Sequence, residues 1–256
     1  MELYRATFLE EQRPGTFGHL SVQSLCAQAG GREVLSRVSL QVAQGEIVGL
    51  VGPDGAGKTT CFEALAGLTP ATSGHVSLSG LDVTDWPINR RAKLGLAYLS
   101  ADVSIFRGMT VEENILAALE TSEIESEERA THLKTLLVDF ELTLVRGQLA
   151  TTLSGGERRR CEVARAMALS PTILLLDEPF KGLDPTSIAS TKRLIGGLKS
   201  RHVGVLVSDY DLRDLLELTD RVYVLDQGRL IFSGSADQLL SDANVRRVFL
   251  GESFSL

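Results

Sequence analysis

The stretch Gly52-Pro53-Asp54-Gly55-Ala56-Gly57-Lys58-Thr59 decides the fold, because it fits the pattern G-x-x-x-x-G-K-[ST]. It lies between an apolar run, residues 46–51, and a helical pattern that reaches Leu68, as a strand-loop-helix phosphate site requires. Glycines allow backbone N–H groups to close around phosphate oxygens, and the following helix adds the positive end of its dipole. We expect these residues and Thr60 to bind a nucleotide, with Lys58 at its β- and γ-phosphates and the Thr59 hydroxyl on Mg²⁺. The alternative is a glycine-rich turn that matches by chance.

A second apolar run, Ile173-Leu174-Leu175-Leu176, ends in the two carboxylates Asp177 and Glu178. Ligands of open α/β sheets bind at the carboxyl ends of the parallel strands, so both acids would face the nucleotide. Asp177 would hold Mg²⁺, and Glu178 would polarise the attacking water, because phosphoryl transfer depends on an aligned nucleophile. Taken alone, a strand that ends in Asp-Glu is more often a helix cap. The glycine loop upstream favours the catalytic interpretation.

A third segment, Leu153-Ser154-Gly155-Gly156-Glu157, opens a helix that runs toward Leu169. Ser154 and Glu157 have the spacing of a capping box, in which each side chain accepts a hydrogen bond from the backbone of the other. The N–H groups at this helix start also form an anion site, so residues 154–157 are predicted to bind the γ-phosphate of a nucleotide held by another subunit. We interpret the following Arg158-Arg159-Arg160 as a solvated helix face and not as a nucleic-acid patch.

The composition of the 256 residues, 43% hydrophobic and 23% charged, is that of a globular protein with one sizeable core. No apolar run reaches the roughly 18 residues of a membrane-spanning helix, and the N-terminus lacks the basic-then-apolar order of a secretory signal. Acidic residues outnumber basic ones by 33 to 26, which argues against binding of nucleic acid or of an anionic membrane surface. The sequence therefore predicts a cytoplasmic chain that meets membranes only through protein partners.

The order of the predicted elements indicates an α/β fold. Residues 1–19 show no period and are predicted to form a loose extension. Short β-branched runs over 20–51 predict strands joined by turns, and helical patterns over about 86–168 predict an inserted helical subdomain. The buried runs 172–176 and 203–207 return the chain to a parallel sheet covered on both faces, and residues 223–232 predict a final hairpin with the turn Asp226-Gln227-Gly228.

Taken together and in this order, residues 52–59, 153–157, 173–178 and Gly182-Leu183-Asp184 resemble an ATP-binding-cassette (ABC) ATPase. The resemblance covers nearly all the chain from about Leu20. It implies a P-loop NTPase with a RecA-like core, an antiparallel β subdomain and the inserted helical subdomain, all within 20–256. It also implies ATP and Mg²⁺ as cofactors.

The resemblance implies partners as well: transmembrane permease subunits and a second cassette in a head-to-tail dimer, homo- or heteromeric. Each site of such a dimer joins the Gly52 loop of one chain to the Ser154 segment of the other, on the inner face of the plasma membrane. Within the family, the segments most similar to the lipopolysaccharide-export cassette are Ser104-Ile105-Phe106-Arg107 and residues 153–160, 162–166, 177–180 and 245–252. Branched-chain amino-acid uptake cassettes are the next most similar.

Three positions depart from the family pattern. Ala29 stands where the family stacks an aromatic ring on adenine, Ala101 where a glutamine senses Mg²⁺ and the γ-phosphate, and Tyr210 where a histidine contacts the γ-phosphate. Tyr210 keeps a hydroxyl at this catalytic position but cannot carry the positive charge of an imidazolium. We expect weak hydrolysis at the chain's own nucleotide site, while residues 154–157 complete the site of a partner.

Two functions are compatible with these residues. The first is an ATPase motor subunit that moves a membrane-embedded permease, and the second is a regulatory or structural partner that binds nucleotide, barely hydrolyses it and pairs with a competent cassette. A DNA-repair or translation-factor cassette is disfavoured by the acidic balance. The resemblance places the groove for a permease helix around Phe106, Arg107 and residues 111–119; the alternative is that Phe106 and Ile115 are ordinary core.

Overall fold

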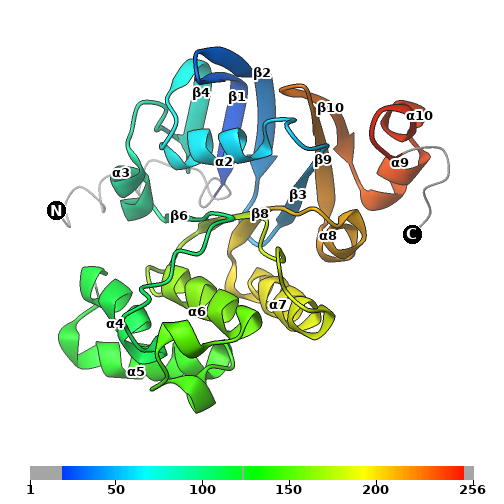
Figure 1. The fold of residues 1–256 in the computed structure, drawn as a ribbon. Coiled ribbons are helices and arrows are strands. Elements are labelled where there is room, and N and C mark those ends of the chain that lie inside the picture. Colours follow the sequence, from blue (N-terminus) through cyan, green and yellow to red (C-terminus); the bar gives the residue numbers. More distant parts are fainter. Residues whose placement is uncertain (1–18, 123, 251–256) are drawn as a thin grey trace.

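The structure is a computed structural model that describes residues 19–122 and 124–250. Apart from His19, the predicted extension at residues 1–19 lies outside the described residues. Two sheets form the centre of the molecule, with α2 against one of them and a group of helices on the opposite side (Figure 1). No helix in the described ranges is long and apolar enough to cross a bilayer.

The larger sheet has six strands in the order β10-β9-β3-β8-β7-β6. Neighbouring strands are parallel except in the β9–β10 hairpin, which confirms the predicted final hairpin. Both faces are covered: in β3, Val48 and Leu50 belong to one buried cluster, and Ile47 and Val51 to the other. The strands are β3 (Ile47–Val51), β6 (Leu96–Leu99), β7 (Ile173–Asp177), β8 (Gly204–Ser208), β9 (Arg221–Asp226) and β10 (Arg229–Gly234).

The smaller sheet is antiparallel, with strand order β2-β1-β4-β5. Helix α2 (Lys58–Ala66) buries Phe62 and Leu65 in the same cluster as the inner face of this sheet and one face of the larger one. The glycine loop that precedes α2 is therefore held by a fully packed helix. The strands are β1 (Leu20–Ala29), β2 (Arg32–Val42), β4 (Ala71–Leu78) and β5 (Leu81–Asp82).

A group of helices packs away from the sheets. Helix α4 begins with the capping box of Thr110 and Glu113, and it buries Ile115 and Leu119 against α5 and α6. The stretch predicted as helical from about residue 86 starts with α3 and with β6, which is an edge strand of the larger sheet. The division into subdomains stays a prediction. The elements are α3 (Ile88–Lys93), α4 (Val111–Thr121), α5 (Ser126–Asp139), η1 (Thr143–Val145), η2 (Ala150–Thr152) and α6 (Gly155–Met167).

The remaining helices follow the strands of the larger sheet. Asp184 caps α7 by accepting hydrogen bonds from the N–H groups of Thr186 and Ser187, and Asp211 caps α8 in the same way. The elements are α7 (Pro185–Gly197), η3 (Lys199–Arg201), α8 (Leu212–Leu218), α9 (Ala236–Ser241), α10 (Ala243–Val245) and η4 (Arg246–Leu250). The order β3-β8-β7 brings the carboxyl ends of three strands together, where the phosphate loop, the Asp177–Glu178 pair and Tyr210 are located, whereas residues 154–157 begin α6.

Candidate active site

The predicted phosphate loop joins β3 to α2, and two of its glycines are required by sterics. A Cβ on Gly52 would lie 2.0 Å from the carbonyl oxygen of Leu225. Gly57 has φ +104° and packs against Val34, a backbone conformation that residues with a Cβ rarely adopt. The Lys58 ammonium donates to the carbonyl oxygens of Gly52 and Pro53 at 2.7 and 3.1 Å. The loop is thus wrapped around a cation, as a phosphate site requires.

The Asp177 carboxylate lies beside this loop, at the end of β7, and is fully buried. Its Oδ1 accepts a hydrogen bond of 2.6 Å from the Ser208 hydroxyl, which is its register partner on β8. Its Oδ2 is buried and has no hydrogen-bond partner within the described residues. Burial raises the pKa of Asp177, and the nearby hydroxyls of Ser208 and Thr59 oppose that rise. The structure therefore brings Thr59 and Asp177 together, with one carboxylate oxygen available to a ligand.

Glu178 begins a tight turn directly after the strand. Its φ of +48° is in the left-handed region, which is uncommon for a residue with a Cβ and is enriched at functional sites. Its N–H donates to the Ser208 carbonyl at 3.0 Å, which fixes the backbone against β8. The side chain is partly accessible and pairs with Lys181. A partly accessible carboxylate next to a buried one is the arrangement expected for a water-polarising acid beside a metal ligand.

The predicted capping box opens α6. The Glu157 N–H donates to the Ser154 hydroxyl at 3.3 Å, and the Ser154 N–H donates to the Glu157 carboxylate at 2.8 Å. The Ser154 hydroxyl also donates to this carboxylate at 2.7 Å, and the hydrogen bonds from the hydroxyl and the N–H of Ser154 lower the pKa of Glu157. Ser154 and Gly155 are exposed, whereas Gly156 is buried and a Cβ there would lie 2.5 Å from the Ser187 hydroxyl. The segment therefore caps α6 as predicted, and its exposed start is accessible to a second chain.

Comparison with known proteins agrees with this arrangement. The family profile described as "ABC transporter" matches residues 35–181, more than half of the chain. The chain belongs to the ABC transporter family. A cassette in this family is an ATP-binding subunit and an ATPase, as the resemblance implied, and cassettes of the family dimerise and work with transmembrane permease subunits.

Several relatives cover almost all of this cassette. An uncharacterised ABC transporter ATP-binding protein of Rhizobium meliloti (strain 1021) is 47% identical over 93% of the chain and 88% of its own length. The lipopolysaccharide export system ATP-binding protein LptB of Escherichia coli (strain K12) is 41% identical over 93% of the chain and 99% of its own. A solved ABC transporter cassette in its ADP conformation has a TM-score of 0.80 at 24% identity, over 91% of this chain and 98% of its own, which confirms the predicted α/β fold.

The three departures from the family pattern lie on three different segments of the structure. Ala29 is exposed at the end of β1, and Ala101 is half-buried in the loop after β6. The Tyr210 side chain is 80% exposed and its ring is not packed against the site. Next to it, buried Asp209 accepts a hydrogen bond of 2.8 Å from the Phe180 N–H, so this loop is anchored by Asp209. The roles predicted for the three positions stay predictions.

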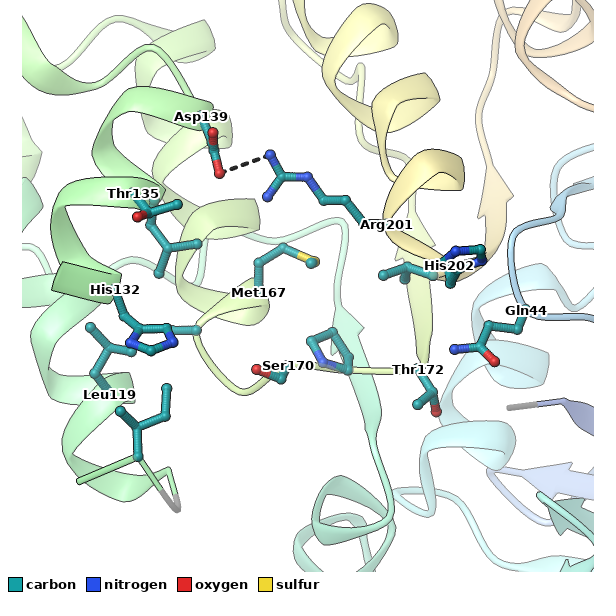
Figure 2. A pocket seen from close by; sticks show the side chains of 15 residues that line it. Gln44, Leu119, His132, Thr135, Asp139, Met167, Ser170, Thr172, Arg201 and His202 are labelled. Atoms are coloured by element: carbon teal, nitrogen blue, oxygen red, sulfur yellow. Dashed lines mark ion pairs between the residues drawn. The ribbon is translucent and has the colours of Figure 1, made fainter. Parts of the chain in front are cut away.

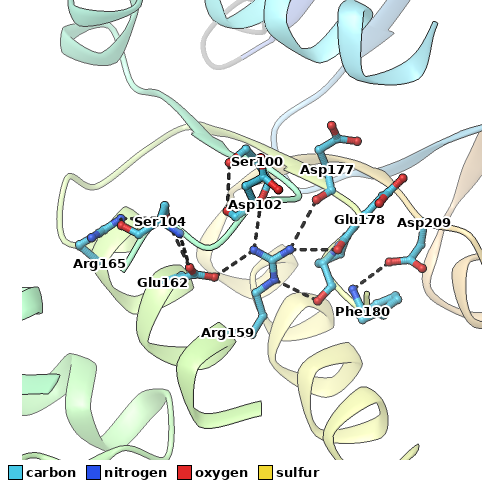
Figure 3. A network of polar contacts seen from close by, with 11 residues as sticks. Ser100, Asp102, Ser104, Arg159, Glu162, Arg165, Asp177, Glu178, Phe180 and Asp209 are labelled. Atoms are coloured by element: carbon cyan, nitrogen blue, oxygen red, sulfur yellow. Dashed lines mark hydrogen bonds and ion pairs between the residues drawn. The ribbon is translucent and has the colours of Figure 1, made fainter. Parts of the chain in front are cut away.

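One site residue was missed by the sequence interpretation. Arg159, expected on a solvated face, is buried, and Figure 3 shows its guanidinium among the backbone carbonyls that follow β7. It donates to the carbonyl oxygens of Glu178 and Pro179 at 3.0 Å each and pairs with Glu162 at 3.1 Å. Glu162 in turn accepts from the Ser104 N–H at 2.7 Å. The expectation was wrong because the spacing of three arginines does not show that one points inward.

The predicted permease groove is only partly supported by burial. Ile115 is fully buried with the other apolar residues of α4, so it is core and cannot contact a partner. Phe106 is 49% exposed, its N–H donates to buried Asn114, and the Arg165 guanidinium lies 4.7 Å from its ring centroid. Exposed apolar side chains accompany it in the surrounding loops: Val103, Met109 and Leu149. The exposed surface is therefore the loop before α4, not the helix.

A cavity of about 360 Å³ lies elsewhere, between α5 and the starts of β7 and β8 (Figure 2). Arg201 and Asp139 bridge it with an ion pair of 2.8 Å. It adjoins the amino ends of the strands, whereas ligands of open α/β sheets bind at the carboxyl ends. The cavity is thus separate from the candidate active site.

Proposed function

We propose that the chain is the ATP-driven subunit of a transporter for lipopolysaccharide export, acting as a dimer on the inner face of the plasma membrane. The likeness to LptB proteins supports the cargo class: those of Acidithiobacillus ferridurans and Escherichia coli are 44% and 41% identical over 93% of the chain. The observation that carries the ATPase activity is that Lys58 and Thr59, which follow β3 at the start of α2, and the Asp177–Glu178 pair at the end of β7 lie on the same edge of the sheet, with only β8 between the two strands.

Mg²⁺ fits the residues present at this site. The unpartnered Oδ2 of Asp177 and the exposed hydroxyl-bearing Thr59 are oxygen donors of the type that Mg²⁺ prefers. When bound, the ion would neutralise charge on the phosphates. Lys58 would bind the β- and γ-phosphates, and Glu178 would orient the water. The Gly52 to Thr60 loop of one chain and residues 154–157 of the other would enclose one nucleotide.

We propose that the exposed loop around Phe106 receives the permease. Half of the ring is available to a partner, while Asn114 and Arg165 hold it in place. An exposed aromatic side chain held in a defined position is a common anchor of protein interfaces. Membrane association would then be indirect, through this contact.

A second function is favoured by Ala101 and Tyr210: a regulatory subunit that binds nucleotide, hydrolyses it slowly and completes the site of a competent cassette. A branched-chain amino-acid uptake cassette is a further alternative for the cargo.

Co-purification separates these possibilities. The chain is expressed with a lipopolysaccharide-export permease pair or with a branched-chain amino-acid permease pair, and ATP turnover is measured in vesicles. We expect binding and stimulated turnover with the first pair only, and loss of binding in Phe106→Glu. Leu144→Glu, at a fully accessible apolar residue, is the matched control and should bind normally. Binding to the uptake permease alone would contradict the proposed cargo.

A further inference from the structure

Lys181 forms an ion pair with the water-polarising acid. Its ammonium lies 3.0 Å from Oε2 of Glu178. The side chain of Lys181 is 62% exposed and that of Glu178 only 22%, so the lysine reaches over the carboxylate from the solvent side. The hydrogen bond to Glu178 raises the pKa of Lys181, and the charges of Asp102 and Asp177 act in the same direction. The Lys181 ammonium is therefore held against the Glu178 carboxylate.

The backbone between these two residues is fixed, so the pair does not depend on two free side chains meeting. The Lys181 N–H donates to the Glu178 carbonyl at 3.2 Å and closes a tight turn. Arg159 holds that same carbonyl at 3.0 Å, and Asp209 accepts the Phe180 N–H at 2.8 Å. Because the turn is anchored from both sides, forming the pair orders little more than two side-chain ends.

The pair occupies only one of the two carboxylate oxygens. Oε1 of Glu178 accepts no hydrogen bond from the part of the chain that the structure describes. A carboxylate anchored at Oε2 can present Oε1 to water in one orientation. Ala101 and Tyr210 carry no positive charge, so neither of them is a cationic partner for the Glu178 carboxylate.

We propose that Lys181 is a positioning residue for ATP hydrolysis: it holds Glu178 by Oε2 so that Oε1 orients the attacking water. This proposal rests on the hydrolysis proposed above. The water oxygen forms a bond to the γ-phosphorus while the bond from that phosphorus to the bridging oxygen breaks. The electron pair of the broken bond stays on the bridging oxygen, which leaves as part of ADP. The proton released by the water passes to Oε1 of Glu178 and then to solvent, which leaves inorganic phosphate as the second product.

Steady-state ATP hydrolysis by the purified chain tests the proposal with three variants. Lys181→Met removes the charge and keeps the length, Lys181→Arg keeps the charge, and Lys199→Met removes a lysine that pairs with Asp220 on another part of the surface. In Lys181→Met, kcat and kcat/KM should fall together by about five-fold. This is the largest rate change that the free energy of a partly exposed ion pair can cause. A parallel fall is the mark of an interaction used in the transition state. Lys181→Arg and Lys199→Met should keep kcat.

Three results would overturn the proposal. An unchanged or higher kcat in Lys181→Met would show that the pair does not assist hydrolysis or that it restrains Glu178. A higher KM with unchanged kcat would show that Lys181 binds nucleotide directly. An equal loss in Lys199→Met would show a nonspecific charge effect. If the unmodified chain binds ATP and shows no turnover, the proposed hydrolysis fails as well, which differs from failure of Lys181 alone. Thermal unfolding of each variant checks that it is folded.

Discussion

We predict that nucleotide choice depends on Ala29, whose methyl group is exposed at the position where the family resemblance implies an aromatic ring. Stacking of a base on an aromatic side chain contributes roughly 1 to 3 kcal/mol. Without it, we expect ATP and GTP to bind with closely similar Kd values in titration calorimetry with Mg²⁺. Lys58→Ala is the control, because it removes a charged donor to the phosphates and should weaken both nucleotides about ten-fold or more. A strong preference for ATP would show that another residue supplies the adenine contact.

We predict that Ala101 and Tyr210 limit the rate of hydrolysis. A lost preorganised donor can lower a rate by about 10² to 10³, by analogy with oxyanion holes. We expect slow turnover by the unmodified chain and faster turnover in Ala101→Gln with Tyr210→His. Adding Glu178→Gln to that double variant should abolish the gain. Phosphate release measures all three. Fast turnover in the unmodified chain that Glu178→Gln removes would mean that the substitutions are compensated, and the regulatory function would then be dropped.

Single residues could be predicted from the sequence when their role follows from a local motif. Asp177 at the end of its buried strand and the glycines at 52 and 57 are of this kind. Lys181 and Arg159 are not, because their partners depend on a turn after β7 that no spacing rule specifies. Burial of a charged side chain depends on tertiary contacts, and these are formed by segments far apart in the sequence.

At the scale of the helix, α6 and α4 start with the same capping box, Ser154 with Glu157 and Thr110 with Glu113. Loss of such a cap costs about 1 kcal/mol. We therefore expect Ser154→Ala and Thr110→Ala to lower the free energy of unfolding by similar amounts in urea titrations. Only Ser154→Ala should also lower ATP turnover by the dimer. Equal effects on turnover would mean that Ser154 acts as a cap alone.

Helix α6 is also joined to β7 through Arg159, and the pair with Glu162 is almost fully buried. Removing one partner of a buried ion pair leaves the other unpaired and typically costs 3 to 5 kcal/mol, so we expect about 3 kcal/mol for Arg159→Met. Arg158→Met is the control, since Arg158 is half-buried and, among the described residues, its side chain makes one hydrogen bond, of 3.3 Å to the Leu153 carbonyl. It should stay within about 0.5 kcal/mol of the unmodified chain in chemical denaturation. Equal losses would show that the network does not support the fold.

Most helices and strands could be predicted from the hydrophobic periodicity and the composition of the sequence. The fully buried strands β3, β7 and β8 are continuous apolar runs in the sequence, and α4 and α5 lie within the stretch of about 86–168 that was predicted to be helical. Strand β6 was hidden in the predicted helical stretch, because a four-residue apolar segment has no distinguishable period. Its place at the sheet edge is decided by pairing with β7.

The arrangement of the whole molecule places the Ser154 segment at an exposed helix start and leaves the nucleotide loop on α2, in a different part of the fold (Figure 1). Composite sites between two chains would use both. The two motifs do not show whether the loop and the helix start that form one site belong to the same chain or to two chains. The sequence therefore predicts this assembly only through the family resemblance.

Complementation between two inactive chains tests the composite site. The first chain keeps its nucleotide loop and carries Ala101→Gln and Tyr210→His, which should speed hydrolysis, together with Ser154→Ala, which disables its helix start. The second carries Lys58→Ala and keeps Ser154. Each alone should show low turnover, because every site of either homodimer lacks one part. In the mixture, the loop of the first chain meets Ser154 of the second, and turnover should rise well above the sum of the separate rates, with an optimum near equimolar mixing. A rate equal to that sum would show that the Ser154 segment does not act on the nucleotide of a partner chain, and the head-to-tail dimer would then be rejected.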